Sequence, residues 1–215
     1  AVNVIFTDKT GTLTQNCMTV VEKSVKPEHK DLLNLIGAIN STANFSDDIT
    51  VLGNPTESAI LKAIGITATT ELREEYEILN RIPFSSAWKY MVTHAKSRQT
   101  SEEIMVIKGA PEVISRIIGR NDYLAEVATQ QERGRRAISA AIITSLQFDT
   151  IKKELEQGYA LKNCTYIGTW FIEDPVRSDV PAAIEKCYQA GIDVVMMTGD
   201  NIKTGSEIAR QSGFT

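Results

Sequence analysis

The sequence predicts an α/β protein in which an inserted α+β domain interrupts a parallel sheet. Two apolar runs, residues 2–6 and Asp193–Met197, each lead into a polar turn and predict buried strands. Helical patterns flank the second run, and a strand–helix–strand order favours parallel pairing with right-handed crossovers. The roughly 140 residues between the two runs differ in texture, which indicates a domain inserted into another domain.

Within the insertion, local patterns predict each element in chain order. Apolar residues three and four positions apart predict helices near residues 32–39 and 58–64. Short apolar runs predict an antiparallel sheet with strands at Tyr76–Ile82, 89–94, 104–108 and 137–143. The polar segment 96–103 is expected to be a solvated hairpin loop, and the charged segment 126–136 an exposed helix.

The second parallel strand lies between two predicted helices. The first is expected to open with Ser178 as its N-cap and to stop at Gly191, and the second to cover about residues 204–211. The parallel-sheet domain is therefore expected in two segments, residues 1–20 and 164–215, on either side of an inserted domain at residues 21–163.

Composition limits the class of protein. The chain has 215 residues, of which 42% are hydrophobic and 23% charged, values typical of an ordinary globular core. Its net charge of −4 is unlike that of a general nucleic-acid binder, so no nucleic-acid partner is expected. Three widely spaced cysteines and two histidines do not match a structural zinc site. No run approaches the ~20 apolar residues that a membrane span requires.

The seven residues from Asp8 to Thr14, with the sequence DKTGTLT, have the strongest chemical signal. An acidic side chain at the carboxyl end of a strand lies where open α/β sheets bind ligands. Lys9 and the backbone N–H groups of the Gly/Thr turn are suited to hold phosphoryl oxygens, so Asp8 is a candidate nucleophile toward phosphorus. The alternative is a strand that ends in a solvated aspartate.

Thr10 narrows this chemistry. Soluble phosphatases with an aspartyl nucleophile usually have a second Asp at this place, which protonates the leaving group and then activates water. Thr10 is unable to do either, so an aspartyl phosphate on Asp8 is expected to hydrolyse slowly.

Residues 8–20, DKTGTLTQNCMTV, resemble the phosphorylation signature of the P-type ATPases, ion pumps that pass through an aspartyl-phosphate intermediate. Five further blocks resemble the family in the same order: GNPTE at 53–57, FS at 84–85, KGAPE at 108–112, DPVR at 174–177 and TGDN at 198–201. The resemblance implies a haloacid-dehalogenase-type phosphorylation domain interrupted by a nucleotide-binding domain. It also implies Mg²⁺-dependent transfer of the ATP γ-phosphate to Asp8, coupled to cation transport.

The resemblance implies roles for individual residues. The expected catalytic set is Asp8, Lys9, Thr10, Thr198, Gly199 and Asp200, with Mg²⁺ held by the Asp8 carboxylate and the Thr10 carbonyl. The expected nucleotide-binding set is Glu57, Phe84, Lys89, Lys108, Arg136, Asp174 and Arg177. Phe84 would stack on adenine, and Lys108 would neutralise phosphate at the mouth of the pocket.

Purely structural roles stay open as alternatives for several of these residues. From the residue types and their spacing alone, Phe84 is interpreted as a core residue and Lys108 as a solvent-exposed one. Asp174 and Arg177 are then interpreted as part of an exposed turn. Residues 54–57 read as an N-cap, a proline at N1 and a capping-box glutamate, which gives Glu57 a structural role. The neighbouring Arg133 and Arg135 compete with Arg136, and Ser86 stands where calcium-pump-like members often have a phosphate-clamping Arg.

The resemblance is closest to the calcium-pump-like subgroup. The His-Pro pair of the heavy-metal pumps is absent, since Lys30 follows His29 and Ala95 follows His94. We expect a cytoplasmic fragment of an integral membrane protein whose partners are ATP, the transported cation and the rest of the pump. The fragment itself is not expected to turn over ATP. A stand-alone nucleotide-binding module and a soluble aspartyl phosphatase are the alternatives.

Overall fold

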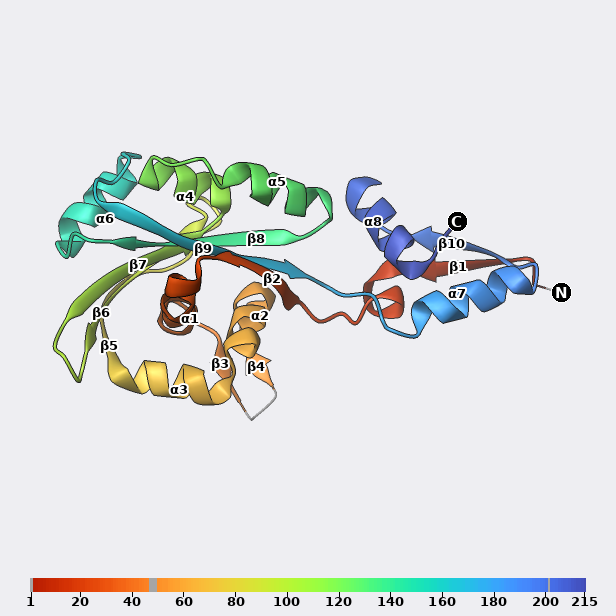
Figure 1. The fold of residues 1–215 in the computed structure, drawn as a ribbon, viewed down its shortest axis with the longest axis horizontal. Coiled ribbons are helices and arrows are strands. Elements are labelled where there is room, and N and C mark those ends of the chain that lie inside the picture. Colours follow the sequence, from red (N-terminus) through yellow and green to blue (C-terminus); the bar gives the residue numbers. More distant parts are fainter. Residues whose placement is uncertain (1, 47–49, 201) are drawn as a thin grey trace.

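The computed structural model describes residues 2–46, 50–200 and 202–215. Two units lie at opposite ends of the long axis and are joined by two neighbouring extended segments of the chain (Figure 1). Among the described residues, no helix combines the length and the apolar character needed to cross a bilayer.

The smaller unit is built on the predicted parallel strand pair. Strands β1 (Val4–Asp8) and β10 (Asp193–Met197) pair in parallel, and Asp8 lies opposite Met197. Helices α7 (Val180–Gln189) and α8 (Ile202–Ser212) pack beside them. The unit's buried apolar cluster consists of Leu13, Val180, Ile184 and Val194. The predicted parallel pairing is confirmed, but the prediction that both strands are buried is wrong for β1, whose Val4, Ile5 and Phe6 are exposed.

The ends of α7 show which capping predictions hold. Gly191 follows the helix with a φ of +71°, a left-handed conformation that glycine adopts without strain, as expected at a helix end. Ser178 is not the N-cap, because α7 begins one residue later than expected and Asp179 occupies the cap position.

The larger unit contains a six-stranded, fully antiparallel sheet (Figure 1). Its strand order is β2 (Thr19–Val25), β9 (Cys164–Glu173), β8 (Arg136–Ile143), β7 (Glu103–Gly109), β6 (Tyr90–Ser97) and β5 (Tyr76–Ile82). Four of these strands were predicted, and β5 has the predicted bounds. The loop between β6 and β7 is shorter than expected, since β6 continues to Ser97.

The positions of β2 and β9 correct the expected domain limits. Both strands belong to the six-stranded sheet and pair with each other, with Val20 opposite Ile172. The limits at residues 20/21 and 163/164 therefore do not match the division in the structure. The sheet takes in both strands because pairing them satisfies the backbone of each where the chain enters and leaves the unit.

Helices cover both faces of this sheet (Figure 1). One face carries α1 (Lys30–Ile39), α2 (Pro55–Ile64) and α3 (Ile66–Glu75), and the other α4 (Pro111–Ile118), α5 (Leu124–Glu132) and α6 (Phe148–Glu156). The predicted helices correspond to α1, α2 and α5, whereas α3 and α6 were not predicted. Short elements complete the chain: η1 (Lys9–Leu13), η2 (Pro27–His29), β3 (Asn44–Phe45) and β4 (Val51–Leu52).

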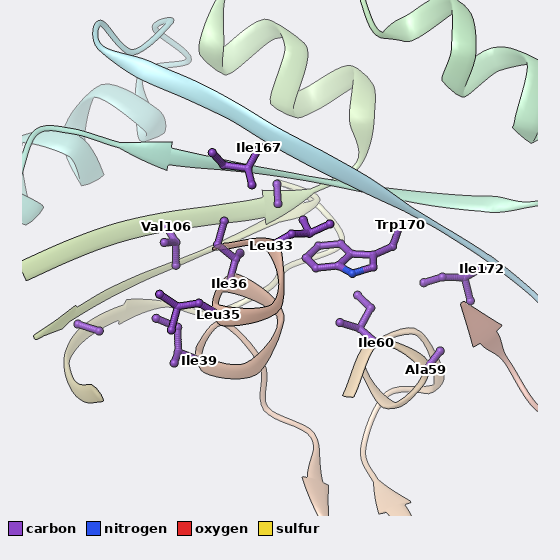
Figure 2. Close-up of a cluster of buried hydrophobic side chains, with 12 residues drawn as sticks. Leu33, Leu35, Ile36, Ile39, Ala59, Ile60, Val106, Ile167, Trp170 and Ile172 are labelled. Atoms are coloured by element: carbon purple, nitrogen blue, oxygen red, sulfur yellow. The ribbon is translucent and has the colours of Figure 1, made fainter. Parts of the chain in front are cut away.

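Trp170 on β9 anchors α1 and α2 to the sheet (Figure 2). Its side chain is fully buried and lies in one cluster with Leu33 and Ile36 of α1 and Ile60 of α2. Gly37 allows this close packing, because a Cβ there would lie 2.8 Å from side-chain atoms of Ile60 and 3.2 Å from Trp170. The first turn of α2, which contributes to the site below, is thereby held at a defined place over the sheet.

Candidate functional site

The loop after β1 turns sharply and leaves Asp8 exposed at the carboxyl end of the strand. Thr10 has φ −76° and ψ 119°, and Gly11 has φ 79° and ψ −6°, the angles of a type II turn that requires glycine at its third position. The Thr14 N–H closes the loop by donating to the Lys9 carbonyl at 3.0 Å.

A second loop, after β10, meets the first. Lys9 Nζ lies 2.6 Å from an Asp200 carboxylate oxygen, and the Asp200 N–H donates to Thr198 Oγ1 at 3.1 Å. Thr198, Gly199 and Asp200 thus lie at the same sheet edge as Asp8, as expected from the parallel pairing. Asn201 of the same motif lies outside the described residues.

This edge suits a hard cation in the chemistry of its oxygens. Carboxylates of Asp8 and Asp200 and the Thr10 carbonyl are donors that Mg²⁺ accepts. In the described part of the chain, no group of three His, Cys, Asp or Glu side chains is arranged to hold a metal. Mg²⁺ usually takes one or two carboxylates together with substrate phosphates.

Asp174 and Arg177 connect the two chain segments that join the units. We call these segments, residues 14–18 and 174–179, the crossing. The two Asp174 carboxylate oxygens accept hydrogen bonds from Thr14 Oγ1 at 2.6 Å and from the Cys17 N–H at 3.0 Å. Arg177 Nη2 donates to the Gly11 carbonyl at 3.1 Å. The Asp174 carboxylate thus binds the segment that follows Asp8 and is half-buried rather than in an exposed turn, while its expected contact with the nucleotide stays a prediction.

A cavity of about 460 Å³ lies in the larger unit, between the first turn of α2 and the sheet. Four predicted nucleotide-binding residues line it: Glu57, Phe84, Lys108 and Arg136. The other lining residues are Thr42, Asn54, Thr56, Ile60, Pro83, Met91, Gly109 and Ile138. The structure therefore gathers residues as far apart in the sequence as Thr42 and Ile138 around one space.

An ion pair forms the floor of this cavity. Lys108 is only 6% exposed, and its Nζ lies 2.6 Å from a Glu57 carboxylate oxygen and also donates to the Asn40 carbonyl. The other Glu57 oxygen accepts from the N–H and Oγ1 of Thr42, at 2.9 and 2.8 Å. Lys108 is therefore neither in solvent nor at the pocket mouth, as the two sequence-based hypotheses had it, because Glu57 and a backbone carbonyl replace water around its ammonium.

The pKa values reflect this burial. Burial raises the pKa of the Glu57 carboxyl, but the Lys108 charge and the hydrogen bonds from Lys108 and Thr42 outweigh it and lower the pKa to about 2. Burial lowers the pKa of the Lys108 ammonium, against the opposing effect of Glu57. The Glu57 carboxylate is therefore ionised at neutral pH.

The structure confirms the predicted N-cap of α2 but not the predicted capping box. Asn54 is the N-cap and its side chain accepts from the Thr56 N–H at 2.9 Å, with Pro55 at the first helical position. Glu57 does not complete a capping box, since its carboxylate is directed to Thr42 and Lys108 instead. Asn40 and Thr42 were not singled out from the sequence, because nothing local links them to residues 15 or more positions away.

The remaining residues of the predicted nucleotide-binding set lie at the edge of the cavity or outside it. Phe84 is 56% exposed just after β5, so its ring is not in the core. Arg136 begins β8 and donates to Thr56 Oγ1, which distinguishes it from Arg135, paired with Glu22 and Glu173. Lys89 does not line the cavity, and its exposed ammonium lies 3.9 Å from Glu112.

Comparison with known proteins identifies this architecture. Residues 28–132 match the family described as P-type ATPase, cytoplasmic domain N. The chain is homologous to the P-type cation ATPases. It is 31% identical to the "Calcium-transporting ATPase" of Bacillus subtilis, over 97% of this chain and 28% of that protein.

Other P-type ATPases match at similar levels. The "Sodium/potassium-transporting ATPase subunit alpha" of Hydra vulgaris is 29% identical over 99% of this chain and 25% of its own length. The "Probable cation-transporting P-type ATPase" of Mycoplasma genitalium is 30% identical over the whole chain and 25% of its own length. This chain therefore spans about a quarter of the length of these relatives, and the matches do not single out the calcium pumps.

The Glu57–Lys108 pair predicts a pH-dependent stability difference. Because the folded-state pKa of Glu57 is lowered, its ionised form stabilises the fold above the ordinary carboxyl pKa, and this contribution disappears as the pH falls toward 2. Glu57→Gln should lower the free energy of unfolding by about 3 kcal/mol at pH 7, since it leaves Lys108 buried without its partner. The deficit should shrink in urea titrations below pH 4. Glu77→Gln, at an exposed pair with Arg98, is the control. A deficit as large at pH 3 as at pH 7 would contradict this linkage.

The crossing gives a second prediction. Asp174→Ala removes the acceptor of the Thr14 hydroxyl and the Cys17 N–H, so hydrogen exchange at the Cys17 amide should accelerate about tenfold. Hydrogen exchange around the cavity should not change, because Asp174 does not line it. Asp179→Ala is a matched control in the same segment, exposed and without a side-chain cap bond. Unchanged exchange in Asp174→Ala would show that these bonds do not hold the crossing.

Proposed function

We propose that the cavity binds ATP and that Asp8, in the parent protein, accepts its γ-phosphate. The observation that carries the proposal is the buried Glu57–Lys108 pair beneath a cavity that also presents Phe84 and Arg136. The exposed ring of Phe84 offers a flat apolar face for a purine base. Glu57 offers a carboxylate oxygen to its amino group, and the Arg136 guanidinium suits phosphate oxygens.

This assignment gives Lys108 a different role from the one expected from sequence. Its charge is matched by Glu57, so we propose that it holds Glu57 in place and closes the floor of the site. Arg136 then supplies the cation for the phosphate chain inside the cavity. Lys89 is proposed as a further phosphate contact outside it, since it lies on the same loop as Phe84 and its ammonium is exposed.

The transfer step follows from the groups around Asp8. An Asp8 carboxylate oxygen attacks the γ-phosphorus, the bond to the β,γ-bridging oxygen breaks, and ADP leaves with that oxygen's electron pair. We propose that the Lys9 ammonium and the turn at Thr198 and Gly199 hold the transferred oxygens, which their position at the same sheet edge as Asp8 supports. Mg²⁺, held by Asp8 and the Thr10 carbonyl, would neutralise phosphate charge. Asp174 and Arg177 are proposed to act on this site by holding the crossing.

We further propose that the parent protein is a cation pump whose cytoplasmic portion includes this chain. The homology to calcium and sodium/potassium pumps supports this, and the blocks at 53–57 and 174–177 favour that group over the heavy-metal pumps. ATP, the transported cation and the rest of the pump are then its partners.

Two other functions receive less support. A nucleotide-binding module without catalysis does not need a Lys9–Asp200 contact between two loops at one strand edge. A soluble aspartyl phosphatase needs an acid and base near Asp8, and Thr10 occupies the place where such enzymes have one.

Ligand titration tests the nucleotide site. Phe84→Ala should weaken adenosine and ATP alike, by about fivefold to a hundredfold, because it removes a stacking surface worth ~1–3 kcal/mol. Arg136→Gln should weaken ATP while leaving adenosine binding unchanged, because its role is electrostatic. Trp88→Ala, at an exposed aromatic residue outside the cavity, is the control for calorimetric titrations. Wild-type affinity for ATP in Phe84→Ala would exclude that ring from the site.

Phosphate labelling tests the role of Asp8. The parent protein incubated with Mg²⁺ and γ-labelled ATP should retain an acid-stable, hydroxylamine-sensitive label, as an acyl phosphate does. Asp8→Asn should bind ATP as tightly but carry no label. Thr10→Asp should shorten the life of the label, because it supplies the missing acid and base. A label that persists in Asp8→Asn would mean that another residue is the nucleophile.

A further inference from the structure

Three cations converge on the carboxyl end of α1. Arg73 Nε donates to the Ala38 carbonyl at 2.8 Å, Arg81 Nη2 to the Ile39 carbonyl at 2.8 Å, and Lys108 Nζ to the Asn40 carbonyl. These consecutive carbonyls end the helix and carry its partial negative charge, which attracts cations. We call Arg73, Arg81 and Lys108 the α1 cation cluster.

The two arginines are fixed by further bonds. Arg73 also donates to the Ala43 carbonyl at 2.9 Å and to Asn44 Oδ1 at 2.7 Å. Arg81 Nε donates to Thr93 Oγ1 at 3.3 Å, and that hydroxyl donates to Asn40 Oδ1 at 2.9 Å. These bonds hold both guanidinium groups in fixed positions, unlike the mobile side-chain charges of an open surface.

Neither arginine lines the nucleotide cavity. Both line a separate hollow of about 350 Å³ that shares Thr42 with it. Thr42 binds Glu57 on the cavity side, so one residue separates the arginines' hollow from the carboxylate in the cavity floor. Their charges act across this short layer of protein, where screening by water is weaker than at an open surface.

The charges in this region do not balance. Glu57 acts electrostatically on Arg73, Arg81 and Lys108, so three buried or half-buried cations share this carboxylate. The α1 terminus adds only about half a negative charge. A positive excess therefore remains behind the cavity floor, in addition to Arg136 at the cavity itself.

We propose that Arg73 and Arg81 act at a distance as charge-selectivity residues, which make the cavity favour a polyphosphate-bearing ligand over a neutral nucleoside. The inference rests on the proposed nucleotide site and adds to it two residues that do not touch the ligand. The competing role is purely structural: if the arginines only cap α1, their loss would distort the floor and weaken every ligand alike.

Arg81→Gln separates the two roles, because glutamine retains an N–H donor for Ile39 but not the charge. The ATP dissociation constant should rise about threefold to tenfold, in line with the effect of local potential on charged ligands, while that of adenosine stays at the wild-type value. Arg81→Lys should restore ATP affinity, since it keeps the charge. Added salt should narrow the difference between wild type and Arg81→Gln. Arg98→Gln, which removes an exposed arginine paired with Glu77, is the matched control.

The outcomes are distinct. Equal weakening of adenosine and ATP in Arg81→Gln, or failure of Arg81→Lys to recover ATP affinity, would overturn the charge-selectivity role. Arg73→Gln repeats the test if Arg81→Gln is not folded by circular dichroism. Absence of ATP binding by the wild-type protein would overturn the proposed nucleotide site itself, whereas ATP binding that is unaffected by either glutamine variant overturns only this inference.

Discussion

The candidate site depends on how a lysine ammonium is accommodated inside the larger unit. An unpaired buried ammonium is strongly unfavourable, so Lys108 requires both the Glu57 carboxylate and the Asn40 carbonyl. Lys108 and these two partners come from three elements: β7, the first turn of α2 and the end of α1. All three must be packed before the pair can form. The same packing leaves the space that Phe84 and Arg136 border, so the cavity and its charges arise together.

Apolar packing makes that ion pair possible. Trp170 and Gly37 let α1 and α2 approach each other over the sheet, which places Asn40 and Glu57 within reach of one lysine (Figure 2). A side chain at Gly37 would push α2 away and lengthen the contact between Glu57 and Lys108. The precision of the polar site therefore depends on a glycine and a tryptophan that lie outside it.

Local signals in the sequence predicted elements and motifs well but not partners. The bounds of β5 and β10 and the Asn54 cap follow from short-range patterns, and the meeting of the Asp8 and Thr198 loops follows from the expected parallel pairing of their strands. Glu57 was misread as a capping-box residue because its true partner, Lys108, lies 51 positions away. The same limit applies to Asp174. The sequence indicated a turn at this residue but gave no sign of its hydrogen-bond donors, Thr14 and Cys17. Strand β2 was missed because its charged residues obscure the apolar pattern of an edge strand.

The crossing links the two parts of the site through one hydroxyl. Thr14 Oγ1 donates to Asp174 in the crossing and also accepts from the Gly11 N–H, 3.3 Å away in the turn that follows Asp8. The Gln15 N–H binds the Pro175 carbonyl beside it, so the two chain segments are paired there by backbone as well as side chains. A rotation of the larger unit that moves Thr14 must therefore also disturb the turn that presents Asp8. The position of the cavity and the geometry around Asp8 are therefore coupled, although Asp8 is not among the described residues that line the cavity.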